Sequence, residues 1–344
     1  MAGVNSFPTS GIFMEDTKFD VLTVGNAIVD ILARADDDFL AKEGIIKGAM
    51  NLIDAERAEH LYSVMGPAIE ASGGSAGNTA AGVASFGGKT AYFGKIADDH
   101  LGSVFTHDIR AIGVHFETKP LESTPPTARS MIFTTPDAER SMNTYLGACV
   151  ELGPEDVDAD VVAQSKVTYF EGYLWDPPRA KDAIRLAAQI AHDNNRQVAL
   201  TLSDSFCVDR FRDEFLDLMR SGTVDMIFAN DAELKSLYQT SDLATGISAL
   251  KEDIPLAVVT QGEEGSLVVT REKTIEIDAH PIDRLVDTNG AGDSYAAGFL
   301  YGMTSGRELA DCARIGGLAA AHVIQHIGPR SQESLADLLG QSGI

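Results

Sequence analysis

The sequence contains little cysteine. Its 344 residues include three, Cys149, Cys207 and Cys312, which lie far apart and form no CxxC pair. An odd and scattered set of this kind argues against a disulfide framework, and it lacks the spacing of a structural zinc site. The chain is nevertheless long enough to bury a large apolar core, as one large domain or as one domain with a small appendage.

Long hydrophobic runs are missing as well. No stretch approaches the roughly 20 consecutive apolar residues that are needed to cross a membrane. The first 20 residues lack both the basic start and the apolar run of a secretory signal. We therefore expect a cytoplasmic protein without a membrane anchor.

Basic residues are outnumbered almost two to one. The chain has 27 Lys and Arg against 51 Asp and Glu, which gives a formal net charge of -24. Such an acidic surface repels nucleic-acid phosphates and anionic lipid, so neither is expected as a partner. A small phosphorylated ligand is still compatible, because it needs only a local positive site. The alternative is that the charge serves solubility alone.

Short apolar segments alternate with helical patterns along the chain. The predicted strands are residues 19–25, 90–94, 167–172, 197–202, 225–230 and 255–262, and the predicted helices are residues 76–86, 99–112, 178–195, 231–239 and 243–252. Apolar strands separated by helices indicate an α/β fold with a mostly parallel sheet covered on both faces. Ligands of such sheets bind at the carboxyl ends of the strands.

One region breaks this alternation. Residues 128–135 and 139–146 are both strand-like, and Pro136-Asp137 between them is typical of a turn, so a hairpin is predicted. A second irregular stretch covers residues 36–54. We expect a single domain of residues 1–344, in which segments of about 31–55 and 114–147 form a small β lid over the sheet. Ordinary edge strands are the alternative.

The stretch VDTNGAGDSYAAGFLYGM, residues 286–303, joins acidic and flexible residues to a helix. Ala296, Phe299, Leu300 and Met303 follow helical spacing, so the helix should begin near residues 290–293. A helix N-terminus offers unpaired backbone N–H groups and a partial positive charge, and glycine lets a ligand approach the backbone. The sequence therefore predicts an anion site here, although a stabilising Asp in the first turn is an alternative explanation.

Phosphoryl transfer would use all four residues of this turn. It needs donors for the charge that develops on the phosphoryl group and a base for the attacking hydroxyl. The backbone of Gly290, Ala291 and Gly292 can supply the donors, and the carboxylate of Asp293 can be the base.

Two motifs resemble the signatures of the ribokinase, or PfkB, family of carbohydrate and nucleoside kinases. DTNGAGDSYAAGFL (287–300) is similar to the C-terminal signature at every defined position. Residues 73–99 are similar to the other one, with Gly73, Gly74, Asn78, Ala80 and Gly87 in place and Ala97 where the family has its closing glycine. The resemblance runs from about residue 19 to 330. It implies a three-layer αβα sandwich that uses ATP and Mg²⁺.

The resemblance also implies roles for individual residues. Asp293 matches the catalytic base, and Gly290, Ala291 and Gly292 match the anion hole. Asn230 and Glu233 resemble an N-x-x-E element that places magnesium and phosphate, although an N-cap role for Asn230 is the alternative. Thr260 and Gly262 are similar to residues near ATP. Asp287 precedes the anion hole as in relatives that bind potassium there, so activation by K⁺ is compatible with the sequence.

The acceptor side looks most like that of the adenosine kinases. Asp30 matches a residue that holds two vicinal hydroxyls of the acceptor sugar, which suits a carboxylate. The other residues matched to the acceptor and the lid are Asn26, Gly74 and Asn78 near the sugar, Leu52, Met142, Leu174 and Phe206 near the base, and Arg140 as a lid arginine for phosphate. For Leu52, Met142 and Leu174, plain core packing is the alternative.

The sequence thus predicts an ATP-dependent nucleoside kinase that phosphorylates the 5′-hydroxyl of a purine nucleoside, with adenosine foremost, as a monomer or homodimer. A PfkB-type sugar kinase acting on ribose, fructose or a keto-sugar acid is the first alternative. A non-catalytic nucleotide-binding module is the second.

Overall fold

The computed structural model describes residues 17–122, 124–137 and 139–344. Most of the N-terminal stretch that we expected not to be a secretory signal lies outside these residues. Within them, no helix combines the length and the apolar composition of a membrane span.

The body of the molecule is built on an eight-stranded sheet. Its strands are β1 (Phe19–Val24), β5 (Thr90–Phe93), β8 (Ser165–Glu171), β9 (Gln197–Thr201), β10 (Met226–Asn230), β11 (Leu256–Thr260), β12 (Ser266–Thr270) and β13 (Thr274–Ile277). They are ordered β13-β12-β11-β10-β9-β8-β1-β5. The six strands from β11 to β5 are parallel, and β12 and β13 continue the sheet in antiparallel pairing. All six predicted strands are therefore confirmed, whereas β12 and β13 were missed.

Helices cover both faces of this sheet. One face carries α5 (Ala159–Ala163), α6 (Pro178–Asp193), α7 (Ser205–Arg220), α8 (Asp231–Leu237) and α9 (Leu243–Asp253), and the other carries α3 (Ser75–Ser85), α10 (Ala291–Thr304) and α11 (Leu309–Val323). Neighbouring strand residues alternate between the two cores. Leu22 packs with Ile184 of α6, and Val21 packs with Phe299 of α10. The predicted three-layer αβα sandwich is confirmed.

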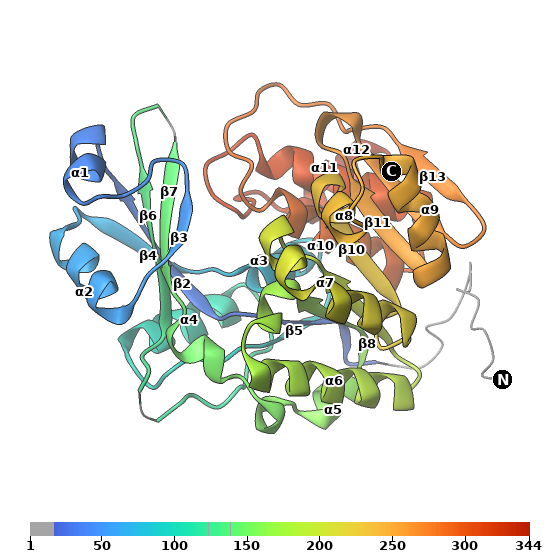
Figure 1. The fold of residues 1–344 in the computed structure, drawn as a ribbon, viewed down its shortest axis with the longest axis horizontal. Helices are drawn as coiled ribbons and strands as arrows, with labels where there is room; N and C mark the ends of the chain where they lie inside the picture. Colours follow the sequence, from blue (N-terminus) through green and yellow to red (C-terminus); the bar gives the residue numbers. More distant parts are fainter. Residues whose placement is uncertain (1–16, 123, 138) are drawn as a thin grey trace.

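A second sheet stands apart from the body, at the left of Figure 1. Its strands are β2 (Ile28–Arg34), β3 (Met50–Leu52), β4 (Ala68–Ser72), β6 (Ala128–Thr134) and β7 (Arg140–Tyr145), in the order β3-β7-β6-β2-β4. Two helices, α1 (Asp37–Lys42) and α2 (Ala55–Val64), belong to the same lobe. The predicted hairpin is present as β6 and β7, which pair antiparallel. We call these five strands the lid sheet.

The lid differs from the prediction in two ways. In the range 114–127, the described residues, 114–122 and 124–127, do not supply a lid strand, because His115 and Leu121 form bridges to Ala91 and Ala97 beside the main sheet. The lid sheet instead includes β4, which lies beyond the predicted segment. Asp30 lies within β2, a strand that was not predicted. That the whole chain forms one kinase domain stays a prediction.

Two further helices complete the fold. α4 (His100–Ala111) packs against β2 and β4 at the base of the lid sheet, where Phe105 and Ile109 are fully buried. α12 (Leu335–Ser342) packs against α3 and α11 through Leu335 and Leu339. The N-terminal ends of α3 and α10 lie next to each other and frame the space between body and lid.

Candidate active site

A cavity of about 590 Å³ lies where the carboxyl ends of the central strands meet the lid sheet. Its lining includes the last residues of β8, β9, β10 and β11, which are Glu171, Thr201, Asn230 and Thr260. The predicted residues that line it are Asn26, Asp30, Leu52, Gly74, Asn78, Met142, Phe206, Asn230, Glu233, Thr260, Gly290, Ala291, Gly292 and Asp293. The sheet therefore brings most of the predicted site into one place, at the edge where parallel sheets bind ligands.

The N-terminus of α10 opens into this cavity. Gly290 is the N-cap residue and has a left-handed backbone with φ of 75°. A Cβ atom there would lie 2.4 Å from the carbonyl oxygen of Pro329, so only glycine fits. At Gly292 a Cβ would meet nothing within 4 Å, so the space beside the helix end is open. With no side chain at the N-cap, the first backbone N–H groups of the helix can bind an anion.

Asp293 lies in the first turn of α10 and is bound by side chains of α3. Its Oδ1 accepts from the hydroxyl of Ser75 at 2.6 Å, and its Oδ2 accepts from Nδ2 of Asn78 at 3.0 Å. These bonds come from another helix and fix the position of the Asp293 carboxylate beside the cavity. Asp293 is therefore not the capping residue of α10. Burial raises the pKa of Asp293, and the bonds from Ser75 and Asn78 and the nearby Arg330 oppose that rise.

Arg330 was not predicted, and its guanidinium joins this arrangement through Asn78. Its Nε donates to Oδ1 of Asn78 at 2.9 Å, and its Nη1 donates to the hydroxyl of Ser72 at 2.8 Å. It follows α11 in a loop, 252 residues from Asn78 in sequence. A single arginine after Gly-Pro carries no sequence signal that would have pointed to the site.

Asp30 lies in β2 and lines the same cavity, near enough to Asp293 for the two charges to interact. The carboxylate lies against Gly73, where a Cβ would come within 2.5 Å of Oδ2. Burial raises the pKa of Asp30 to about 6, while the charges of Arg330 and Arg140 act to lower it. A carboxylate in this position can accept hydrogen bonds from two hydroxyl groups of a ligand.

Glu171 was also missed, although it organises the same wall. Its Oε1 accepts from the backbone N–H of Asn26 at 2.8 Å and from Nδ2 of that residue at 2.6 Å. Its Oε2 accepts from the N–H of Ala76 in the first turn of α3 at 2.9 Å. Burial raises the pKa of Glu171 to about 7. A lone Glu at a strand end is common, and only the three-dimensional contacts show that it joins Asn26 to α3.

Asn230 has the N-cap role that was the alternative for it, and the magnesium- and phosphate-placing role of Asn230 and Glu233 stays a prediction. They form a capping box at the start of α8, in which Oδ1 of Asn230 accepts from the N–H of Glu233 at 2.8 Å and Oε2 of Glu233 accepts from the N–H of Asn230 at 3.0 Å. Both also line the cavity. Burial, with Asp204 and Asp231 nearby, raises the pKa of Glu233 to about 7.

These acidic groups fit a magnesium ion that is carried by nucleotide phosphates. Among the described residues, no group of three or more His, Cys, Asp or Glu could hold a metal by itself. Mg²⁺ at phosphate sites usually keeps several waters and takes one or two carboxylates. Glu233 and the nearby Asp204, which lines the same cavity, are the carboxylates that would supply that charge.

Asp287 does not fit a potassium ion in this structure. Its Oδ2 accepts from Nη1 of Arg140 at 2.5 Å and from the N–H of Gly328 at 3.0 Å, and its Oδ1 accepts from the N–H of Asn289 at 3.0 Å. The carboxylate is thus already paired with one cation and two backbone N–H donors. Neither Asp287 nor Arg140 is among the residues that line the cavity.

Apolar side chains line the cavity from both the lid sheet and α7. Phe206 and Leu52 are 80% and 56% exposed, and Met142 also lines the cavity. Leu174 was predicted here wrongly. It is fully buried in the core beneath α6 and α7, and its neighbour Tyr173 lines the cavity instead, because both lie in a short 3₁₀ turn after β8. Gly262 is likewise outside the lining.

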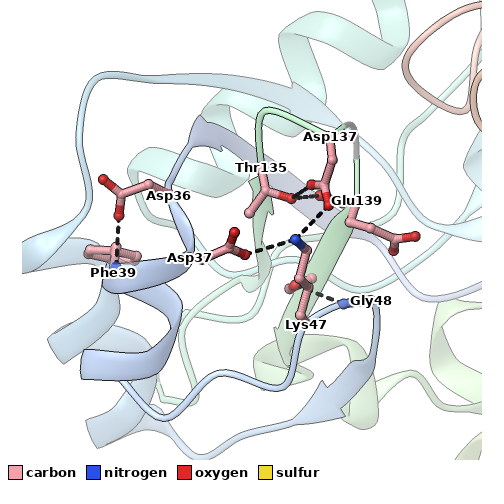
Figure 2. Close-up of polar contacts among 9 residues, drawn as sticks. Asp36, Asp37, Phe39, Lys47, Gly48, Thr135, Asp137 and Glu139 are labelled. Carbon is pink, nitrogen blue, oxygen red and sulfur yellow. Dashed lines mark hydrogen bonds and ion pairs between the residues drawn. The ribbon is translucent and has the colours of Figure 1, made fainter.

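One lysine links two segments at the tip of the lid, as Figure 2 shows. Nζ of Lys47 donates to Asp37 of α1 at 2.8 Å and to Asp137 of the hairpin turn at 2.7 Å. The hydroxyl of Thr135 donates to the same Asp137 at 2.5 Å. The hairpin and α1 are therefore linked on the side away from the main sheet.

Comparison with known proteins agrees with this geometry. A crystal structure of adenosine kinase from Sinorhizobium meliloti is 68% identical, with a TM-score of 0.88 over 94% of this chain and 99% of that one. A probable sugar kinase from Rhizobium etli is 64% identical, with a TM-score of 0.89 over 95% and 99%. Adenosine kinase from Saccharomyces cerevisiae is 28% identical over 332 residues, which cover 90% of this chain and 96% of the relative.

The sequence model of the pfkB family carbohydrate kinases matches residues 49–335. The predicted family resemblance and the predicted kinase class are confirmed, and adenosine kinases are among the homologues. The chain belongs to the pfkB family of carbohydrate kinases.

Proposed function

We propose that this protein is an ATP-dependent kinase that phosphorylates the 5′-hydroxyl of a purine nucleoside, with adenosine as its preferred acceptor. One observation carries the proposal most strongly. Asp293, at the open N-terminus of α10, and Asp30, on the lid sheet, face the same cavity. The 68% identity to a structure named adenosine kinase supports adenosine over other acceptors.

The transfer itself would take place at the start of α10. The acceptor oxygen bonds to the γ-phosphorus while the bond from that phosphorus to the ADP oxygen breaks, and the hydroxyl proton passes to Asp293. The backbone N–H groups near Gly290 and Gly292 stabilise the negative charge on the transferred group. Ser75 and Asn78 keep both oxygens of Asp293 in place, which limits the reorganisation that the step requires.

The acceptor would lie between Asp30 and the apolar side chains that line the cavity. The carboxylate of Asp30 accepts from the two vicinal hydroxyls of ribose, and Asn26, Gly74 and Asn78 line the same region. Phe206, Leu52 and Met142 offer apolar surface for the base. ATP would lie along Asn230, Glu233 and Thr260. Bound Mg²⁺ supplies charge neutralisation to its phosphates, and Glu233 is the residue that would hold the ion.

A panel of acceptors tests this proposal. Purified protein with Mg·ATP is given adenosine, guanosine, inosine, ribose or fructose, and ADP and the phosphorylated product are both quantified. We expect equal amounts of ADP and AMP with adenosine and the highest kcat/KM for that acceptor. A higher kcat/KM with a simple sugar would favour the sugar kinase that the Rhizobium etli relative is named for. No product with any acceptor would favour a nucleotide-binding module.

Thermal stabilisation gives an independent check. A ligand that binds the folded state raises the melting temperature. Adenosine alone should raise it, and ribose at the same concentration should not. Residence in the cytoplasm as a monomer or homodimer remains our proposal, which cell fractionation and light scattering can examine.

A further inference from the structure

Arg330 lies directly behind the proposed reaction centre. It follows Pro329, whose carbonyl packs against Gly290 of the phosphate-binding turn. Its guanidinium donates to Asn78 and Ser72, and Nη1 also lies 3.7 Å from Oδ2 of Asp108. Arg330 is not among the residues that line the active-site cavity. Any effect on substrates must therefore pass through its neighbours.

The first such neighbour is the amide of Asn78. Because Nε of Arg330 donates to Oδ1 of Asn78, the Nδ2 group of that amide must face the other way, where it donates to Oδ2 of Asp293. A reversed amide would put two oxygens against each other at Asp293 and two donors against each other at Arg330. The arginine thus determines which atom of Asn78 meets the carboxylate.

The second effect is that of charge. Arg330 lowers the pKa of both Asp293 and Asp30, against the larger raising effect of burial. Other titratable groups also act on these three residues. Glu171 near Asp293 and Asp108 near Arg330 are acidic and make carboxylate ionisation harder, whereas Tyr169 and Tyr173 near Asp293 and Tyr92 near Arg330 are neutral. Arg140 is the exception, a cation that acts on Asp30. Without Arg330, a larger fraction of Asp293 would be protonated at a given pH.

We infer that Arg330 is a positioning residue for phosphoryl transfer: it orients the Asn78 amide toward Asp293 and keeps Asp293 ionised without touching substrate. The inference rests on the proposed function, in which Asp293 is the base. It adds a role for the loop after α11, which neither family signature includes.

Two substitutions separate the two effects. Arg330→Met removes the charge and the hydrogen bonds, whereas Arg330→Lys keeps the charge but lacks the planar pair of N–H groups. For Arg330→Met we expect the acid limb of the pH profile of kcat/KM for adenosine to move up by about one pH unit, the low end of the effect of a neighbouring opposite charge. For Arg330→Lys we expect a lower kcat with the acid limb close to that of the wild type.

Arg110→Met is the matched control. Arg110 donates two bonds to the carbonyl of Phe116 and is outside the active-site cavity. Its loss should lower the melting temperature without moving the acid limb. An acid limb for Arg330→Met that coincides with that of the wild type would overturn the inference. If Arg330→Met does not fold, Arg330→Gln, which is uncharged but still has N–H donors, replaces it.

A titration without substrate keeps this inference separate from the proposed function. The protein is labelled with ¹³C at the Asp carboxyl carbons, and the Asp293 resonance is assigned as the one lost in Asp293→Asn. Its titration midpoint should rise in Arg330→Met, and an unchanged midpoint would overturn the charge effect. If wild-type protein phosphorylates neither adenosine nor any other acceptor, the proposed function fails, and the midpoint still decides the role of Arg330 toward Asp293.

Discussion

Arg140 and Asp287 form an ion pair between the lid and the loop that leads into the phosphate-binding turn, with Nη1 2.5 Å from Oδ2. Both side chains are almost completely buried. Nε and Nη2 of Arg140 are buried as well and have no hydrogen-bond partner. The guanidinium therefore has donors left over at a place next to the proposed phosphate site.

Arg140→Ala should lower kcat and leave nucleoside affinity nearly unchanged. The unused donors can bind phosphate oxygens when both substrates are present, and losing one such group costs roughly 10²-fold in kcat. Steady-state kinetics and adenosine binding by calorimetry measure the two quantities. Arg34→Ala, an exposed arginine at the end of β2 in the same lid sheet, is the control and should have little effect. Weaker nucleoside binding with unchanged kcat would place Arg140 in the acceptor pocket.

Activity should not depend on potassium. Because Asp287 is already paired with Arg140 and accepts two backbone N–H groups, its carboxylate is not available for a monovalent cation. Replacing K⁺ by tetramethylammonium at constant ionic strength should leave kcat within about twofold, a difference of roughly 0.4 kcal/mol in barrier. A stronger dependence would mean that Arg140 leaves Asp287 during turnover.

Asp293→Asn should give a stable and nearly inactive protein. The asparagine oxygen can still accept from Asn78, and its amide group can donate to Ser75, whose hydroxyl can rotate, so the contacts survive. Without a base, kcat should fall roughly 10²–10⁴-fold. Asp311→Asn, in the first turn of α11, is the control for a helix-end Asp away from the cavity. A kcat within about threefold of the wild type, roughly 0.65 kcal/mol, would exclude Asp293 as the base.

Stability and activity should change in opposite directions below neutral pH. Burial raises the pKa of Asp30 to about 6 and that of Glu171 and Glu233 to about 7, so the folded state holds protons that the unfolded chain releases. This contribution to stability is complete below about pH 4 and is lost as pH rises through 6 to 7. The melting temperature should therefore rise between pH 8 and pH 5, while kcat/KM falls as Asp30 becomes protonated.

Asp30→Asn should reduce that rise in melting temperature. The control is Asp137→Asn, because bonds from Lys47 and Thr135 hold the pKa of Asp137 at about 2. Asp137 remains ionised throughout the range from pH 8 to pH 5 and should not alter the slope. A melting temperature that falls steadily from pH 8 to pH 5 in the wild type would contradict the assignment of these buried carboxylates.

2′-Deoxyadenosine should be a much poorer acceptor than adenosine. If Asp30 accepts from both ribose hydroxyls, the deoxynucleoside leaves one contact of a charged group unmade, which costs roughly 1.5–3 kcal/mol in kcat/KM. The same comparison in Asp30→Asn should show a smaller ratio between the two nucleosides. Equal kcat/KM values for the two nucleosides in the wild type would remove this role of Asp30.

Much of the architecture could be predicted because its signals are local. The β-branched runs of the six parallel strands and the turn at Pro136-Asp137 depend on neighbouring residues, and each was found close to its observed bounds. β12 and β13 pair at the sheet edge and were missed, although β12 (SLVVT) carries a β-branched run similar to that of β11 (LAVVT). β2 was missed because Asp30 interrupts an otherwise apolar strand, and that interruption is itself functional in the proposed site.

The site could be predicted only where a motif carried it. Gly290 and Asp293 lie in one signature and Asn78 in the other, so their meeting in the cavity followed from the family resemblance. Arg330 and Glu171 act through contacts with distant segments, which a single sequence does not reveal. The prediction of Leu174 missed the cavity by one position. A 3₁₀ turn determines whether Tyr173 or Leu174 faces the cavity, and the sequence does not reveal the type of this turn.

The contact between Gly290 and Pro329 has an evolutionary consequence. A Cβ at position 290 would collide with the carbonyl of Pro329, the residue directly before Arg330. A side chain at position 290 would push against the backbone of Pro329, so the phosphate-binding turn and the segment that carries Arg330 constrain each other. Among related enzymes we expect these two segments to change together: lineages that lose the Gly-Pro-Arg sequence should have rebuilt the support of Asn78 from another part of the chain.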